Sequence, residues 1–287
     1  MLPEAQSHKQ LTLANANRRD IIVDFTHAPD ELFLENIMEQ TDGRGPKGIN
    51  PKKKVNLLKF IVEGNPVEGN LVIAEGTPLR PHVALNPEDV KITREFKFNR
   101  SNGAWQINDK WLSPRRADAV PALGQTERWI LKNGGGGWAH PIHIHLSGFQ
   151  VQSLNGRTPP KEIQFNNDTV ALEGGDEAEI LIRFSTFTVP FALHCHILEH
   201  EDMRMMSVFD PQPAGQLSPC DGVTAIDPMI SGIAHHPQGL FGDRGPVDIP
   251  LIQDQGVGIP HTDFTPGGGG VAPSPTEVGR KHNSGKN

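Results

Sequence analysis

The sequence predicts an all-β fold in which residues 90–210 form a β-sandwich. Short segments rich in β-branched and aromatic residues follow one another through this block, as expected of strands. Turn residues, such as Glu-Gly-Gly-Asp at 173–176, separate these segments at short spacing, which is typical of a sandwich. The block is about the usual size of a single domain.

The first part of the chain contains few strand signals. Residues 19–25 and 56–62 are rich in β-branched and apolar side chains and are expected to be strands, with a glycine- and proline-rich loop between them. Two or three strands in residues 1–65 are too few to close a sandwich unaided. Residues 66–89 follow, and their proline and glycine punctuation indicates a linker.

The central block has a denser strand pattern. The expected strands are 91–98, 105–108, 126–132, 143–151, 169–172, 179–184 and 191–196. After residue 210 the composition changes, because residues 211–287 contain 14 glycines and 11 prolines. This level predicts a disordered tail. The adjacent His235 and His236 within it are interpreted as solvated side chains rather than as a metal site.

Composition excludes several classes of protein. Charged residues make up 21% of the chain and the net charge is −7. The sequence also has no basic run that would predict a nucleic-acid or anionic-membrane partner. No segment approaches the roughly 20 apolar residues of a spanning helix. No signal peptide is visible at the N-terminus, and the compartment stays open. The two cysteines, Cys195 and Cys220, allow no internal disulfide if Cys195 binds a metal.

The segment 191–206 carries three histidines, one cysteine and three methionines. In a strand, side chains alternate between the two faces. Leu193 and Cys195 would therefore point one way, and His194 and His196 the other. One strand would thus present a thiolate to one metal site and two imidazoles to another, with both sites joined through the backbone of residue 195.

A second histidine segment, 138–145, begins at Trp138 and contains His140, His143 and His145. Two histidines, one cysteine and a weak methionine are the ligands of a blue-copper electron-transfer site. The candidates for this site are His140, Cys195, His200 and Met205. Met203 and Met206 compete with Met205 for the weak position, and the remaining histidines, His143, His145, His194 and His196, would face a second metal cluster.

Zinc is the alternative metal. His196 and His200 are four residues apart, as in a zinc-protease helix, but that motif needs a glutamate directly after the first histidine, and Ile197 stands there. A structural zinc site built on Cys195 would leave too many imidazoles unused.

These motifs, HPIHIH and HCHILEHED with the following methionine pair, resemble the C-terminal part of the multicopper oxidases, and most closely bilirubin oxidases and spore-coat-type laccases. The resemblance implies that residues 90–210 are a Greek-key cupredoxin domain. It also implies that residues 1–65 are the C-terminal remnant of the family's middle cupredoxin domain, and that an N-terminal cupredoxin domain is missing.

The resemblance further implies the copper sites. His140, Cys195, His200 and Met205 match the ligands of type 1 copper. In the trinuclear cluster, where the family reduces dioxygen to water, His145, His194 and His196 match ligands of the paired type 3 coppers, and His143 matches a ligand of type 2 copper. The family draws four further histidines from its N-terminal domain, and we expect this chain alone to lack them and to be incomplete as an oxidase.

Two further residues match positions of the family. Glu201 matches an acid thought to deliver protons, or it orients a ligand histidine. Trp138 matches a tryptophan at the substrate entrance of bilirubin oxidases, or it caps the end of a strand. The implied function is oxidation of phenols, aromatic amines or tetrapyrroles with dioxygen as acceptor. The alternative is a mononuclear blue-copper electron-transfer module or an inactive fragment.

Overall fold

The computed structural model describes residues 2–218, apart from 41, 43, 66, 67, 70–72, 102, 114 and 115. Most of the predicted disordered tail, with Cys220, His235 and His236, lies outside the described residues. Residues 211–218, which were assigned to the tail, hydrogen-bond to the domain: Gln212 N donates to the Pro121 carbonyl at 2.9 Å, and Ser218 Oγ donates to Asp210 at 2.6 Å.

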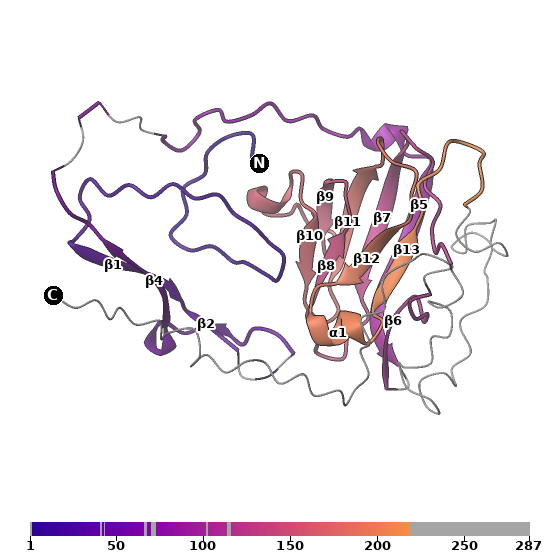
Figure 1. Ribbon diagram of the computed structural model, residues 1–287, viewed down its shortest axis with the longest axis horizontal. Coiled ribbons are helices and arrows are strands. Elements are labelled where there is room, and N and C mark those ends of the chain that lie inside the picture. The colour runs from indigo at the N-terminus through magenta and orange to yellow at the C-terminus, as the bar shows by residue number, and fades with distance from the viewer. Residues whose placement is uncertain are drawn as a thin grey trace, which may run out of the picture. The chain divides into compact units, whose positions relative to one another are not determined.

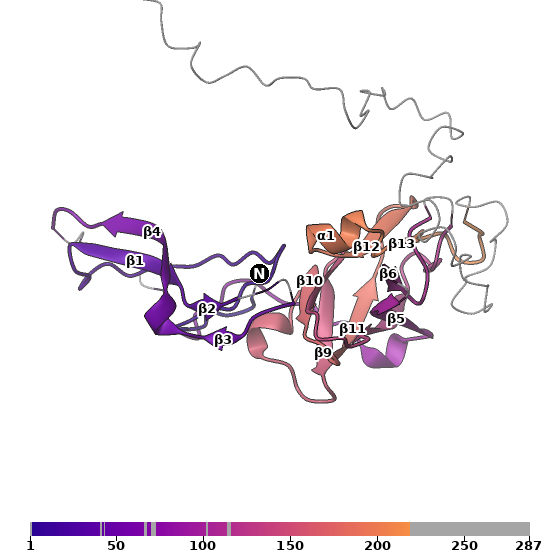
Figure 2. The ribbon, with the colours of Figure 1, turned by 90° about the horizontal axis from the view of Figure 1, so that it is seen from below.

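The central block is a sandwich of two sheets, which confirms the all-β prediction (Figures 1 and 2). The first sheet has four strands in the order β10-β8-β12-β13: Thr169–Leu172, His140–Ile144, Phe191–Cys195 and Met206–Phe209. The second has five strands in the order β6-β5-β7-β11-β9: Ala104–Ile107, Ile92–Ser101, Thr126–Asn133, Glu177–Arg183 and Phe149–Leu154. Among the described strands of these two sheets, β5 and β7 are the one pair that forms a parallel ladder.

Among the described residues, four strands precede the sandwich. β1 (Glu31–Asn36) pairs with β4 (Val55–Ile61), and β2 (Met38–Glu39) pairs with β3 (Gly48–Ile49). The strand expected at 56–62 corresponds to β4, but the one expected at 19–25 is wrong. Ile21 and Ile22 are 50% and 69% exposed. No described strand pairs with this segment, and β-branched residues form a strand only where a partner ladder and a packed face stabilise it.

The expected strand 143–151 is also wrong, because the chain turns within it. β8 ends at Ile144 and β9 begins at Phe149, and between them Leu146 adopts a positive φ of 71°. β8 starts at His140, so this histidine lies in the strand rather than before it. The sequence predicted neither β13 nor the short helix α1, Leu198–Asp202.

Three 3-10 turns complete the described elements: Pro51–Lys53, Pro87–Asp89 and Lys161–Ile163. No helix among the described residues is long and apolar enough to cross a membrane.

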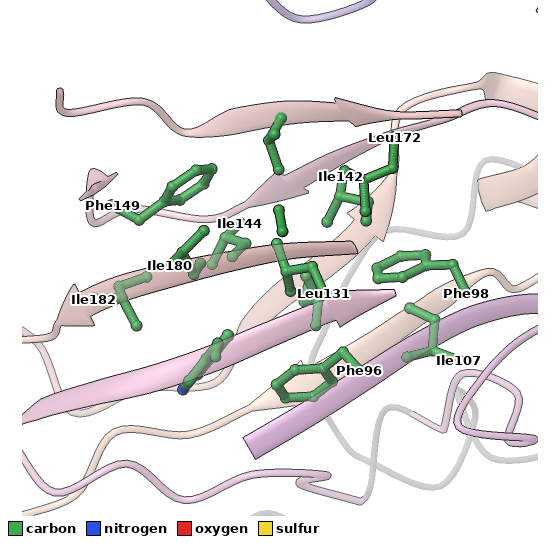
Figure 3. Packing of buried hydrophobic residues seen from close by; sticks show 14 of the residues in the cluster. Phe96, Phe98, Ile107, Leu131, Ile142, Ile144, Phe149, Leu172, Ile180 and Ile182 are labelled. Atoms are coloured by element: carbon green, nitrogen blue, oxygen red, sulfur yellow. The ribbon is translucent and has the colours of Figure 1, made fainter. Parts of the chain in front are cut away.

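The core lies between the two sheets of the sandwich. Every second residue of β5 from Arg94 to Phe98 is buried while its neighbours are exposed, so the strand turns one face to the core. Figure 3 shows Phe96, Phe98 and Leu131 from one sheet meeting Ile142 and its neighbours from the other. Cys195 and Met205 belong to the same buried cluster. The copper-ligand candidates on this side are therefore fixed by core packing.

Candidate metal centres

Strand β12 carries ligand candidates on both of its faces. It pairs with β8, with His194 opposite His143 and Cys195 opposite Ile142. Leu193 and Cys195 are fully buried in the core between the sheets. His194 points to the opposite face, toward His143. The alternation expected from the sequence therefore places two groups of side chains back to back across one strand.

The first group is made of His140, Cys195 and His200, all buried. The Sγ atom of Cys195 lies 3.4 Å from His140 Nδ1 and 3.5 Å from His200 Nδ1. The two Nδ1 atoms lie 3.2 Å from each other. Three residues from β8, β12 and α1 thus direct one sulfur and two nitrogens to the same point.

These three residues fit a copper ion. Donor atoms that share one ion at bond lengths of about 2.0–2.3 Å in a trigonal plane are separated by about 3.5–3.8 Å, close to the separations in this group. Two imidazoles and a thiolate are the equatorial set of a blue-copper site. Neutral imidazoles and a thiolate gathered so closely in a buried position are well placed to share one cation.

Burial sets the protonation of this group. It lowers the pKa of His140 to about 3, helped by neighbouring His200, and lowers the pKa of His200 to about 4. Burial also raises the pKa of the Cys195 thiol to about 12. Both imidazoles are therefore neutral near pH 7, with lone pairs available, and a metal ion must displace the thiol proton to bind sulfur.

Met205 lies beside this group. Its side chain is fully buried. Two backbone hydrogen bonds connect it to ligand residues of this group: Met205 N donates to the His200 carbonyl at 3.0 Å, and Cys195 N donates to the Met205 carbonyl at 3.2 Å. Met203 is 37% exposed, which leaves it a poor candidate for a ligand in a buried site.

Aromatic rings cover His200 and His140. The ring of Trp105 lies against the ring of His200, with centroids 3.7 Å apart and planes tilted by 31°. Trp138 meets Trp105 edge-on at 5.2 Å and His200 at 5.4 Å. Sequence reasoning singled out Trp138 but missed Trp105. The only available signal was that Trp105 is one of four tryptophans in the chain.

The second group lies on the other face of β12. Ligand atoms of His143, His145 and His194 all lie within 4.8 Å of one another. The Nε2 atoms of His145 and His194 are 3.2 Å apart. The ring of His196 lies next to this group, with centroid distances of 5.4 Å to His194 and 5.6 Å to His143. The structure therefore brings together all four histidines that the sequence assigned to a second cluster.

Hydrogen bonds orient these imidazoles. His143 Nδ1 lies 2.9 Å from the Asp168 carbonyl and 3.0 Å from Thr169 Oγ1. A carbonyl only accepts, so Nδ1 carries the proton and Nε2 is left to bind a metal. His194 Nδ1 lies 3.1 Å from the Cys195 carbonyl in the same way. Burial lowers the pKa of both His143 and His145, which favours the neutral, metal-binding form.

A segment near the N-terminus contacts the strands that carry these histidines. Asn15 Nδ2 donates to the His196 carbonyl at 3.1 Å, and Asn17 Nδ2 donates to the Thr169 carbonyl at 3.2 Å. Arg18 makes a two-pronged ion pair with Asp168 at 2.8 and 2.6 Å. Asp168 is the residue whose carbonyl holds His143. No sequence motif pointed to these contacts, because they join residues 150 to 181 positions apart.

Glu201 reaches the second group from α1. Its Oε2 atom lies 2.6 Å from His194 Nδ1, although the two atoms are not aligned as a hydrogen bond. The neighbouring His200 belongs to the first group. The helix therefore contributes one residue to each side of β12.

Comparisons with known proteins agree with this arrangement. Residues 84–215 match a protein family described as multicopper oxidase. The chain is similar to a multicopper oxidase of Staphylococcus haemolyticus, with 39% identity over 68% of this chain and 46% of the relative. It is also similar to a bilirubin oxidase of Albifimbria verrucaria, with 29% identity over 70% of this chain and 36% of the relative.

Among solved structures, a laccase-like multicopper oxidase from Ochrobactrum sp. is 30% identical. The match covers 58% of this chain and 40% of the Ochrobactrum chain, with a TM-score of 0.50. The chain thus spans less than half the length of the curated relatives it matches.

Proposed function

Residues 84–215 belong to the multicopper oxidase family, and from this premise we propose that the protein is a copper-dependent oxidoreductase. It would take electrons one at a time from a small phenol, aromatic amine or tetrapyrrole. It would pass them to a copper cluster that reduces dioxygen to water. The solved Ochrobactrum enzyme is described as oxidising lignin model compounds and lignosulfonate, which agrees with aromatic donors.

One observation carries this proposal. Cys195 supplies the sulfur of the first group, and its Sγ lies 3.4 and 3.5 Å from two imidazole nitrogens. Its neighbour His194, one peptide unit away, belongs to the second group. A covalent path of one residue thus joins a site suited to accepting single electrons to a site with several imidazoles. A structural metal site has no need of such a connection.

Copper bound by His140, Cys195, His200 and Met205 would accept and release single electrons, and copper bound by His143, His145, His194 and His196 would reduce dioxygen. The protein's own residues set the conditions. Trp105 and Trp138 cover His200, which excludes water from the first group. They also place aromatic surface between a donor and the ligand imidazole. Asp168 and Thr169 hold His143 by Nδ1 and so direct Nε2 to the second group.

Reduction of dioxygen to water consumes four protons, so it needs a nearby acid. Glu201 supports this part of the proposal, because its Oε2 lies 2.6 Å from His194 Nδ1 and its side chain is only 15% exposed. In this position the carboxyl group would deliver protons to the second group. The same proximity would also let the carboxylate help to orient His194, and one carboxyl can serve both purposes.

A second candidate is a mononuclear electron-transfer module. The described residues gather four histidines in the second group, whereas the family cluster uses eight. The other described histidines, His8, His27 and His82, join neither metal-ligand group. Under this alternative only the first group would hold copper firmly. The family's remaining four ligands would come from a cupredoxin domain outside these residues.

Loading of the 287-residue chain with copper tests the proposal. We expect an intense visible thiolate-to-copper absorption and about one tightly bound copper per chain. Cys195→Ser should abolish the absorption, because a hydroxyl cannot supply the soft sulfur donor. Cys220→Ser is the matched control and should keep it. A blue band that survives Cys195→Ser would refute the assignment.

Metal analysis and oxygen uptake decide between the two candidates. With half of the cluster ligands, the 287-residue chain should bind the additional coppers weakly and oxidise a phenolic dye slowly. Four firmly bound coppers per chain with sustained oxygen uptake would show that this chain, or a second copy of it, completes the cluster.

A further inference from the structure

The turn at residues 14–18 has a defined backbone path. Asn17 N donates to the Ala14 carbonyl at 3.0 Å, and Ala14 N donates to Asn17 Oδ1 at 3.1 Å. Ala16 adopts a positive φ of 68°, which a residue with a side chain keeps only where its surroundings determine it. Arg18 Nη1 donates to the Ala16 carbonyl at 2.9 Å, so the guanidinium is tied to the same turn.

A continuous set of polar contacts connects Arg18 to His143. The guanidinium donates to both carboxylate oxygens of Asp168, at 2.8 and 2.6 Å. The Thr169 hydroxyl donates to the same carboxylate at 3.2 Å, so its oxygen can accept from His143 Nδ1, which lies 3.0 Å away. The Asp168 carbonyl lies 2.9 Å from the same nitrogen. Two acceptors therefore hold the His143 proton on Nδ1, and Arg18 binds the residue that supplies one of them and orients the other.

The turn also bonds to the two strand ends beside the second histidine group. β10 has four residues and lies at the edge of its sheet, where β8 is its neighbour among the described strands. Asn17 Nδ2 donates to the carbonyl of Thr169, the first residue of β10, at 3.2 Å. Asn15 Nδ2 donates to the carbonyl of His196, directly after β12, at 3.1 Å. A strand paired on one side opens locally more easily than a central one, so these bonds act where the group needs support.

A second ion pair joins the N-terminal part of the chain to the sandwich and provides a comparison. Lys161 Nζ lies 3.5 Å from Glu4 Oε1, and the Lys161 side chain is 70% exposed, as is that of Arg18. Lys161 lies in the 3-10 turn Lys161–Ile163, outside the strands that carry the histidines. The two pairs therefore match in exposure and differ in what their acidic partner contacts.

We propose that residues 14–18 are a clamp that positions the second histidine group for metal binding. Arg18 acts through Asp168 to keep the proton of His143 on Nδ1, which leaves Nε2 for the metal. The effect on metal affinity rests on the proposed copper function, whereas the position of the proton is a property of the metal-free chain. Because Arg18 is 70% exposed, solvent screens its ion pair, and its loss should weaken metal binding only about two- to fivefold.

The metal-free chain gives the first test. Nitrogen NMR of an isotopically labelled chain at mildly alkaline pH, where imidazole is neutral, reports which ring nitrogen carries the proton. The His143 signals are assigned by their loss in His143→Gln. Wild-type His143 should be the Nδ1–H tautomer, and Arg18→Gln should add a population of the Nε2–H tautomer. Lys161→Gln is the matched control and should keep the wild-type signals.

Copper titration then tests the consequence for the metal. The chain first receives one equivalent of copper, and the blue band shows that the first group is filled. Calorimetry follows the binding of further Cu²⁺, which Arg18→Gln should weaken about two- to fivefold without changing the blue band. Arg18→Lys keeps the charge but loses the two-pronged geometry, so it should restore part of the affinity. Lys161→Gln should bind like the wild type.

A double variant shows whether Arg18 acts through Asp168. In an Asp168→Asn background, Arg18→Gln should weaken the further copper little more, because the two residues act as a pair. Two losses that multiply in full would overturn the clamp. Urea unfolding should give Arg18→Gln and Lys161→Gln similar stabilities, since both lose one exposed ion pair.

The outcomes separate the clamp from the copper function. Further copper bound equally by the wild type and Arg18→Gln would overturn the clamp and leave the copper function standing. An unchanged His143 tautomer in Arg18→Gln would overturn the clamp as well. A shifted tautomer, together with a wild-type chain that binds no copper beyond the first, would refute the second group as a copper site and with it the role of the clamp toward the metal.

Discussion

His194 and Met206 lie directly opposite each other in the antiparallel pairing of β12 with β13. Side chains of opposed residues point to the same face of a sheet. Met206 therefore points with His194 toward the second histidine group, away from the face that carries Cys195. Met205, one residue earlier, bonds through its carbonyl to Cys195 N and has a fully buried side chain. This register therefore favours Met205 over Met206 as the proposed weak ligand of the first group.

Met205→Leu should keep the blue absorption and raise the reduction potential, because a weak thioether donor to oxidised copper is lost. Met206→Leu is the matched control and should leave the potential nearly unchanged. Redox titration followed at the blue band measures both. A shift confined to Met206→Leu would mean that the register of β13 at the site is wrong.

The sequence predicted the strands that carry their own signal. β5, β7, β10 and β12 alternate or carry β-branched runs, and each was expected within a few residues of its observed bounds. Residues 19–25 have the same composition but no partner strand in the described structure. The break at Leu146 rests on one positive φ, which composition does not encode. Local pattern thus gave the elements, while pairing decided which of them formed.

The site divides along the same line. Histidine and cysteine spacing placed the two groups on opposite faces of one strand, because strand alternation is a local rule. Trp105 and Asp168 were missed because each reaches its histidine across a large sequence distance: Trp105 lies 3.7 Å from His200, and the Asp168 carbonyl lies 2.9 Å from His143 Nδ1. Neither residue stands at a characteristic spacing from the histidine motifs, so the sequence alone does not identify it as part of the site.

Trp105→Leu should destabilise the fold by about 2–3 kcal/mol, because it removes a buried ring and leaves a cavity. It should also shift the blue band or the reduction potential, since the ring against His200 is lost. Trp129→Leu is the control, because Trp129 is fully buried in the core and bonds to Glu127. That variant should lose similar stability in urea without moving the band. An unchanged spectrum in Trp105→Leu would rule out its influence on the site.

Arg94 and Glu127 form an ion pair across β5 and β7, with contacts of 2.7 and 2.9 Å and side chains 1% exposed. Arg94→Met should cost about 3–5 kcal/mol, because the Glu127 carboxylate stays buried without its guanidinium. The double variant Arg94→Met/Glu127→Leu should recover much of that loss, since no buried charge is left. Urea unfolding of all three chains measures the difference. A double variant less stable than Arg94→Met would contradict this view of the pair.

Lys110 offers a test of stability against pH. Its side chain is buried near Asp118, with Nζ 3.6 Å from Oδ1, while Arg116 and Ser207 also bond to that carboxylate. Burial lowers the pKa of Lys110 below its ordinary value of 10.5, with Asp118 opposing and Arg116 adding to the shift. Between the folded pKa and 10.5 the folded state has lost this proton while the unfolded state keeps it.

Stability rises with pH wherever the unfolded state binds more protons. The wild-type chain should therefore gain stability relative to Lys110→Met as the pH rises through that interval, and the difference should level off below it. Urea unfolding of both chains at several values between neutral pH and pH 10.5 measures the trend. Lys91→Met, at an exposed lysine, should run parallel to the wild type. A difference between wild type and Lys110→Met that falls with rising pH would mean that the Asp118 contact outweighs burial. The folded pKa of Lys110 would then lie above its ordinary value.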